Sequence, residues 1–214
     1  ILCTRSIPSA LIEAAAAEGT GIRIEEFIRV ETRVSGEAAI LIAALAGMPD
    51  AIVVFTSKHA VEAVAASLQT MAAAPQPRWR LYCISAVTAS VAAARFPCSV
   101  LAGAGSCAGD VAREILAAGE SGEVWFFSGD RRRDTLPAQL TAGGRHVRET
   151  VVYETILTPH SVPGFFDGIL FFSPSGVESY FSANRPDPRT VLFAIGGTTA
   201  GALKEKSPNP VVVS

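Results

Sequence analysis

Hydrophobic and polar positions along the chain form two kinds of segment that alternate. Short runs rich in β-branched and aromatic residues are separated by Ala-rich stretches of helical length. This alternation is typical of a parallel α/β sheet, in which a helix follows each buried strand. The predicted strands cover residues 1–4, 22–27, 51–55, 81–84, 99–101, 124–127, 168–172, 191–195 and 211–213.

Proline and glycine mark where these elements begin and end. Pro8 suits the first turn of a helix, and the glycines at 19 and 21 end that helix before the next strand. Proline-rich polar clusters at 75–77 and 185–188 predict loops, because proline interrupts both helix and sheet hydrogen bonding.

The chain also contains an internal repeat. Residues 1–32 align without a gap on residues 124–155, so that Ile1 falls on Val124 and Gly21 on Gly144. Two further pairs follow in the same order: FTSKHAVEA (55–63) with FFSPSGVES (171–179), and YCISAVTAS (82–90) with FAIGGTTAG (193–201). The alternative is chance similarity among Ala-rich segments. Matching turn residues favour duplication, and hence two similar α/β domains.

Composition narrows the class of protein. The 214 residues are 49% hydrophobic and 18% charged, as expected of a folded chain. The net charge of −2 gives no overall positive field that would attract a nucleic-acid backbone, so nucleic acid is not an expected partner.

The longest apolar run, 39–48, is too short to span a bilayer, and no secretory signal is visible, which predicts a soluble cytoplasmic protein. The four cysteines show no metal spacing and are expected to be reduced and mostly buried.

The candidate chemistry lies where predicted strands meet helices. In open parallel sheets, ligands bind at the carboxyl ends of the strands, where helix N-termini offer free N–H groups. The corresponding segments, which are rich in Ser, Thr and Gly, are 56–57, 85–88, 128–133, 173–176 and 196–199. Hydroxyl groups there can bind carboxylates or phosphates, although each taken alone is equally an ordinary N-cap.

Three adjacent arginines, Arg131 to Arg133, follow the predicted strand 124–127. On a first helical turn their charges would oppose the helix dipole, so an anion-holding role for at least one of them is a reasonable interpretation. The alternative is a solvated charge run, with two of the three facing water.

Two other features leave alternatives open. GAGSCAG (103–109) with Asp130 beyond it loosely matches a dinucleotide turn, but its spacing is GxGxxxG, so we interpret it as a tight turn and keep nucleotide binding as the alternative. Tyr153 ends a repeat unit where the other copy has Val30, and the phenol is either an interface aromatic or a general acid. The three histidines are isolated from other ligands, so no metal site is expected.

The order of these segments resembles the uroporphyrinogen-III synthase family. The resemblance rests on residues 55–63, 85–90, 128–155, 171–179 and 194–203, and so covers nearly the whole chain. It implies an α/β fold of two flavodoxin-like parallel-sheet domains, related by internal duplication and joined by a two-stranded linker, with the active site in the cleft between them. The implied domains are 1–27 plus 163–214 and 36–149, and the implied linker strands are 28–35 and 150–162.

The resemblance further implies a lyase of tetrapyrrole and heme biosynthesis that needs no cofactor or metal and acts as a cytoplasmic monomer. Such an enzyme cyclises hydroxymethylbilane, a linear tetrapyrrole polycarboxylate, with loss of water and inversion of the terminal pyrrole ring. By analogy, Tyr153 is the expected proton donor to the departing hydroxyl. The expected substrate-binding residues are Thr56, Ser57, Thr88, Ser128, Arg131, Ser173, Ser175, Gly176, Thr198 and Thr199. The alternative is a two-domain α/β protein that binds a nucleotide or small anion.

Overall fold

The chain folds into two compact units, one of which is inserted into the other. The computed structural model describes residues 1–71 and 75–214. Unit 1 combines Ile1–Arg29 with Thr155–Ser214, and unit 2 consists of Val30–Glu154. The contiguous halves that the repeat alone would suggest are therefore not the folding units, because the first 29 residues pack with the last 60.

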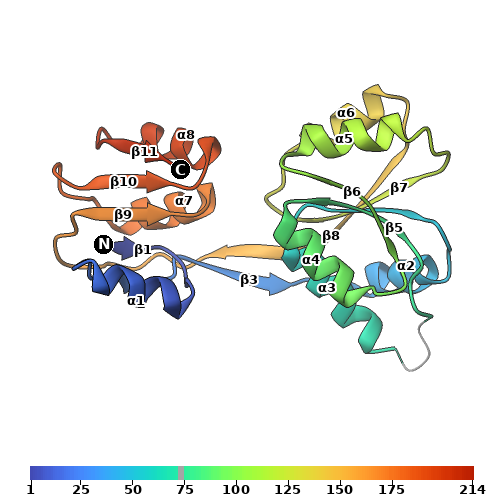
Figure 1. Ribbon diagram of the computed structural model, residues 1–214, viewed down its shortest axis with the longest axis horizontal. Coiled ribbons are helices and arrows are strands. Elements are labelled where there is room, and N and C mark those ends of the chain that lie inside the picture. Colours follow the sequence, from blue (N-terminus) through green and yellow to red (C-terminus); the bar gives the residue numbers. More distant parts are fainter. Residues whose placement is uncertain (72–74) are drawn as a thin grey trace. The chain divides into compact units, whose positions relative to one another are not determined.

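Unit 1 is built on a five-stranded parallel sheet in the order β11-β10-β9-β1-β2, of which β11, β10, β9 and β1 are labelled in Figure 1. Its helices follow β1, β9 and β10 along the chain. The strands are β1 (Leu2–Cys3), β2 (Arg23–Ile24), β9 (Gly168–Phe171), β10 (Val191–Ala194) and β11 (Val211–Val213), and the helices are α1 (Ser9–Ala17), α7 (Pro174–Ala183) and α8 (Gly197–Lys206).

Unit 2 carries a six-stranded sheet in the order β3-β8-β7-β4-β5-β6. Its strands are β3 (Ile28–Thr32), β4 (Ile52–Phe55), β5 (Arg80–Ile84), β6 (Val100–Gly105), β7 (Val124–Gly129) and β8 (Val147–Leu157). Its helices are α2 (Gly36–Ala46), α3 (Lys58–Gln69), α4 (Ala86–Arg95), α5 (Ala108–Ala117) and α6 (Thr135–Ala142). β7 pairs in parallel with both β4 and β8.

Strands β3 and β8 carry the chain across the boundary between the units. Thr158 N donates to Phe27 O at 3.0 Å, and Arg33 N donates to Val152 O at 2.8 Å. Residue numbers rise along one strand as they fall along the other, so the two segments run antiparallel. β8 was not among the strands predicted from the hydrophobic pattern, because half-buried polar and apolar residues mix along it.

The two sheets have the same topology, and it confirms the predicted fold class. When the five strands of unit 1 are numbered in chain order, their order across the sheet is 2-1-3-4-5, which is the order of flavodoxin-like folds. Unit 2 gives the same order when counting starts at β7, followed by β8, β4, β5 and β6. The three repeat pairs therefore occupy equivalent strands and helices: β1–β2 with β7–β8, β9–α7 with β4–α3, and β10–α8 with β5–α4.

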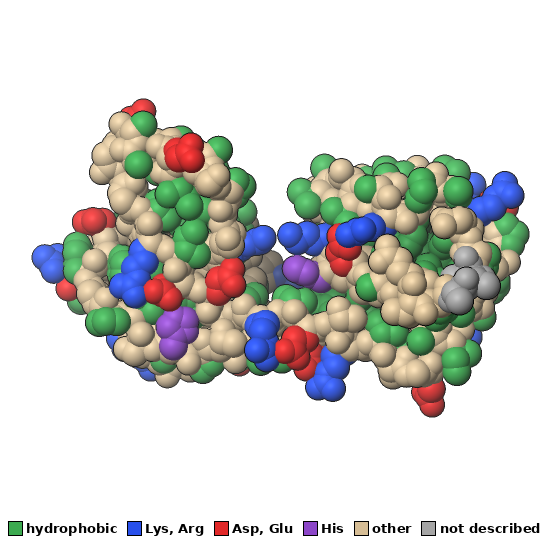
Figure 2. Space-filling view, turned by 90° about the horizontal axis from the view of Figure 1, so that it is seen from below, with side chains coloured by type: hydrophobic (Ala, Val, Ile, Leu, Met, Phe, Trp, Pro, Cys, Tyr) green, Lys and Arg blue, Asp and Glu red, His purple; other side chains and the backbone are tan. Residues whose placement is uncertain are grey.

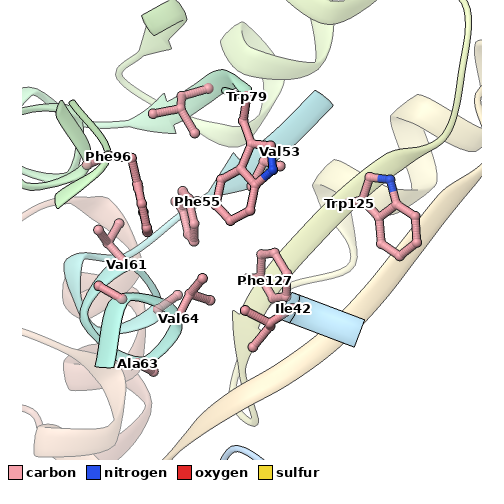
Figure 3. Packing of buried hydrophobic residues seen from close by; sticks show 14 of the residues in the cluster. Ile42, Val53, Phe55, Val61, Ala63, Val64, Trp79, Phe96, Trp125 and Phe127 are labelled. Atoms are coloured by element: carbon pink, nitrogen blue, oxygen red, sulfur yellow. The ribbon is translucent and has the colours of Figure 1, made fainter. Parts of the chain in front are cut away.

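Alternating residues on the strands of unit 2 face two separate cores. Val53 and Phe55 point toward α2, α3 and α4, while Ile52 and Val54 point toward α5 and α6. In the first core the Phe55 ring lies between those of Phe96 and Phe127, with ring centroids 5.8 Å apart in both pairs (Figure 3). Full burial on both faces explains why these strands read as unbroken apolar runs.

Two expectations about the chain are corrected. Cys3 and Cys83 are buried, but Cys98 and Cys107 are exposed, because they lie in the turns on either side of β6. That strand, expected at 99–101, runs instead over Val100–Gly105 at the sheet edge, where glycine and alanine continue the pairing with β5. Among the described helices, none has both the length and the apolar character needed to cross a membrane.

Candidate functional site

In unit 2, several predicted residues gather at the carboxyl edge of the sheet. The connections leave β4 and β7 in opposite directions, which makes this pair the topological switch point where such folds bind ligands. Thr56 and Ser57 follow β4, and Ser57 caps α3 by accepting a hydrogen bond from His59 N at 3.1 Å. Ser128 and Gly129 form the end of the neighbouring strand β7.

Tyr153 lies at this same edge. It pairs with Gly129 across β7 and β8, at a register shift, and its carbonyl accepts from Asp130 N at 3.1 Å. The half-buried ring covers Gly129 so closely that a Cβ there would lie 2.4 Å from the ring atoms Cε2 and Cζ. On its other side is the His59 ring, with centroids 5.8 Å apart. The structure thus brings the predicted proton donor to the switch point of unit 2.

Thr88 is placed differently from the expectation for an open ligand group. Its side chain is buried, and its Oγ1 lies 3.2 Å from Ser85 Oγ, which also accepts from Thr88 N at 3.3 Å. Ser85 itself is exposed and has φ 73° and ψ 147°, a region that side-chain-bearing residues rarely adopt. The exposed hydroxyl at this junction therefore belongs to Ser85.

The arginine cluster requires a correction. The three arginines were expected on a first helical turn, but α6 begins only at Thr135, so they lie in the preceding loop. Arg132 forms a two-pronged ion pair with Glu149 and a further one with Asp134, and these carboxylates raise the pKa of its guanidinium. The fully buried Ser128 donates to the same Glu149 at 2.7 Å.

Of the three arginines, Arg132 is half-buried and ion-paired with Glu149, while Arg131 and Arg133 are exposed. The predicted ligands Ser128 and Arg131 consequently differ in accessibility. The role of Glu149 could not be found from local sequence, because it sits on β8, 17 residues from its partner Arg132.

In unit 1, the carboxyl edge carries the residues predicted after β9 and β10. Ser173 caps α7 by accepting from Gly176 N at 3.1 Å, and its hydroxyl lies 3.1 Å from that of Ser175. After β10, Thr198 is exposed and Thr199 is buried at the start of α8. Thr199 thus repeats the buried placement of Thr88, with which it aligns in the repeat.

Sequence reasoning missed one residue at this edge, Arg5. It lies two residues beyond the end of β1, and its guanidinium carbon lies 5.2 Å from the centre of the ring of Phe172, the residue that follows β9. The repeat could have identified it, because Arg5 aligns with Ser128. A second aligned pair has matching roles: Glu26 accepts from Ser6 N at 3.2 Å, as Glu149 accepts from Ser128. Each carboxylate accepts hydrogen bonds from the loop after the first strand of its repeat: Glu26 from Ser6, and Glu149 from Arg132.

The glycine-rich segment does not form a dinucleotide turn. Gly103 and Gly105 lie within β6, an edge strand away from the switch point. A Cβ at Gly103 would lie 2.7 Å from Cδ1 of the buried Tyr82 ring, so close packing against that ring favours glycine here. The start of α5 is closed by Asp110, which accepts from Ser106 N and Oγ, and these hydrogen bonds lower the pKa of Asp110 to about 2. Nucleotide binding is therefore not favoured.

The fold and this edge chemistry define a class: a two-domain α/β protein of duplicated flavodoxin-like units, with hydroxyl groups and a phenol at the strand ends. Residues 9–214 match the family model of uroporphyrinogen-III synthase HemD. The chain belongs to the uroporphyrinogen-III synthase family.

Solved structures give the same fold. The synthase of Helicobacter pylori 26695 is 19% identical, with a TM-score of 0.66 over 98% of this chain and 90% of that one. A mutant of the synthase from the extremely thermophilic bacterium Thermus thermophilus is 16% identical, with a TM-score of 0.64 over 100% of this chain and 92% of that one. Curated proteins give no significant match.

Proposed function

We propose that this chain is a uroporphyrinogen-III synthase. It cyclises hydroxymethylbilane to uroporphyrinogen III, a lyase reaction that eliminates water and inverts the terminal pyrrole ring. The observation that carries this proposal is the family match over residues 9–214 together with the hydroxyl-rich strand ends of both units.

The chemistry required of the protein is mainly orientation. Loss of the substrate hydroxyl leaves an azafulvene cation, and free substrate closes spontaneously to the isomer without inversion. The enzyme must therefore hold the terminal ring so that only one carbon reaches the cation. The substrate carries acetate and propionate groups, which hydroxyl and backbone N–H donors can hold.

Within this proposal, the groups that bind substrate carboxylates are those that remain accessible at the strand ends. They comprise Thr56 and Ser57 in unit 2 and Ser173, Ser175 and Thr198 in unit 1, with the exposed Arg131 as a charge partner. The N–H of Gly176 is already donated to Ser173 Oγ, so Gly176 supports the start of α7 rather than offering a free donor. Buried Thr88, Ser128 and Thr199 support the fold of the same edge rather than offering open hydroxyls.

Tyr153 is the proposed proton donor to the departing hydroxyl. Its ring covers Gly129 at the switch point of unit 2, where its phenol O–H can act as a hydrogen-bond donor. Proton transfer from a positioned side chain contributes a part of the rate, while orientation of the reacting ring decides the isomer.

The remaining elements of the proposal concern organisation and location. We propose that residues 28–35 and 150–162 link domains 1–27 plus 163–214 and 36–149 as a hinge. We further propose that the enzyme works as a cytoplasmic monomer without a nucleic-acid partner. Basic and acidic side chains are interspersed on the face shown in Figure 2, which supports the proposal that nucleic acid is not a partner. Size-exclusion chromatography with light scattering tests the oligomeric state.

The decisive experiment supplies freshly generated hydroxymethylbilane to the purified chain without any added cofactor. After oxidation, chromatography separates porphyrin isomers I and III. The expected product is isomer III in excess over the spontaneous isomer I. Product composed of isomer I alone, at the rate of the buffer control, would contradict the proposed function.

A further inference from the structure

Arg5 in unit 1 is a charged residue outside the predicted site. This residue lies in the loop between β1 and α1, at the strand pair β1–β9 where the connections of the sheet diverge. That is the switch point of unit 1, equivalent in topology to the β7–β4 pair that carries Tyr153 and Ser57 in unit 2.

The backbone on both sides of Arg5 is held in place. Thr4 N and Thr4 Oγ1 both donate to Leu170 O of β9, at 3.1 and 2.9 Å. Ser6 N donates to Glu26 Oε1 at 3.2 Å. Thr4 also lies close to the first turn of α7, because a Cβ on Gly176 would be 3.8 Å from Thr4 Oγ1. The Arg5 side chain therefore projects from a fixed point beside the start of α7.

The Arg5 guanidinium packs over the Phe172 ring and is not paired with a carboxylate among the described residues. Its central carbon lies 5.2 Å from the centre of the Phe172 ring, the residue immediately before Ser173. Within the described part of the chain, no acidic side chain forms an ion pair with it. A stacked guanidinium keeps its N–H groups at the edge, where they can engage a planar carboxylate in two parallel hydrogen bonds.

Other arginines of unit 1 use these donors within the protein. Arg23 pairs with Glu25, Arg189 pairs with Asp187, and Arg185 donates to the carbonyls of Phe181 and Asn184. In unit 2, Arg132 is likewise neutralised by Glu149 at the edge of the sheet. The guanidinium of Arg5 is thus distinguished by both its location and its uncommitted charge.

We propose that Arg5 is a substrate-binding residue that holds one acetate or propionate carboxylate, with the hydroxyls of Ser173 and Ser175 beside it. This inference rests on the proposed function and adds to it the main charged contact of unit 1. Because the carboxylate is present in substrate and product alike, the contact contributes to binding and not to the chemical step.

The test compares Arg5→Gln and Arg5→Lys with the wild-type enzyme in the isomer III assay. Arg5→Gln is expected to raise KM for hydroxymethylbilane about 10-fold or more while kcat stays within about twofold, as for loss of a charge-assisted hydrogen bond. Arg5→Lys keeps the charge without the paired geometry and should recover part of the KM. Thermal unfolding of both variants checks that they fold as the wild type does.

Arg189→Gln is the matched control. Arg189 is also an exposed arginine of unit 1 over a phenylalanine ring, with its guanidinium carbon 4.7 Å from the centre of Phe165, but it is paired with Asp187 and precedes β10 at the opposite edge. Its removal should leave KM unchanged. An equal rise of KM in this control, an unchanged KM in Arg5→Gln, or a loss confined to kcat would each overturn the role of Arg5.

A binding measurement separates this inference from the proposed function. Uroporphyrin III, the oxidised product with the same carboxylates, is titrated into each variant while protein fluorescence quenching is followed. Weaker binding by Arg5→Gln, with Arg189→Gln as wild type, supports the role of Arg5 even if the wild type makes no isomer III. Equal binding by all variants refutes it, even if turnover is observed.

Discussion

The Tyr153 hydroxyl can be removed without disturbing the ring that carries it. Tyr153→Phe keeps the aromatic contact with Gly129 and His59 and deletes only the proposed proton donor. We expect the rate of isomer III formation to fall several-fold or more, with little change in the free energy of unfolding. Initial rates and denaturant titrations measure the two effects. An unchanged rate would reduce the residue to a packing role.

Ser179 carries a buried hydroxyl that makes no hydrogen bond with the described residues. Its Oγ is fully buried in α7 and has no hydrogen-bond partner among the described residues, and the aligned position in unit 2 is Ala63, also fully buried. Ser179→Ala should raise the free energy of unfolding by about 1 kcal/mol, because an unsatisfied polar group leaves the core. Urea denaturation measures the gain.

Ser182→Ala serves as the control for that stability change. The Ser182 hydroxyl is satisfied, since it donates to Ser179 O at 2.7 Å. Its removal should not stabilise the protein. A similar gain in both variants would mean that helix propensity alone, and not the orphaned hydroxyl, explains the effect.

At the level of elements, the two repeats have different residues at the same turn. Helices α4 and α8 begin after aligned N-cap residues that share an unusual backbone conformation, Ser85 with φ 73° and Gly196 with φ 90°. Ser85→Gly removes the strain of a side chain in this region, and a glycine N-cap costs only a few tenths of a kcal/mol. We expect the free energy of unfolding to rise by about 1 kcal/mol, measured by denaturant titration; a decrease would show that the Ser85 cap outweighs the strain.

Helix α5 gives a prediction about pH. Hydrogen bonds from Ser106 and Cys107 lower the pKa of Asp110 to about 2, below the usual 3.8 of an aspartate. A carboxyl with a lowered pKa stabilises the fold above about pH 4, and this contribution disappears as the pH falls from 4 to 2. In Asp110→Asn, stability should therefore depend less on pH over that range. Ser106→Ala, which removes the hydroxyl donor but keeps the backbone N–H donor, should show part of the same change in denaturation at graded pH.

At the level of the whole molecule, the separate cores predict separate responses to damage. Leu192 in β10 and Leu81 in β5 align in the repeat, and both are buried, but they belong to different units. Leu192→Ala should speed amide hydrogen exchange in residues 1–29 and 155–214 by the equivalent of roughly 2–5 kcal/mol, leaving 30–154 nearly unchanged. Leu81→Ala should give the reverse pattern. Uniform acceleration in both variants would contradict independent units.

Some features of this fold are encoded in local sequence, and others are not. Strands such as Ile52–Phe55 are buried on both faces, so their apolar runs predict them directly, and the repeat anticipates the shared strand order. The pairing of Arg132 with Glu149 and the stacking of Arg5 on Phe172 join residues far apart in sequence. Such contacts arise from strand neighbours in space, so hydrophobic period and spacing do not reveal them.

Insertion of one unit into the other has a consequence for the nascent polypeptide. As the ribosome proceeds, residues 30–154 emerge as a complete unit, while β1 and β2 still lack β9, the strand against which Leu2 and Cys3 pair. The amino-terminal segment must therefore wait until β9 (Gly168–Phe171) has been synthesised before its sheet can form. A stall or truncation after residue 154 would leave a finished unit 2 attached to residues 1–29 without β9, which makes this segment the vulnerable part of the chain during its own synthesis.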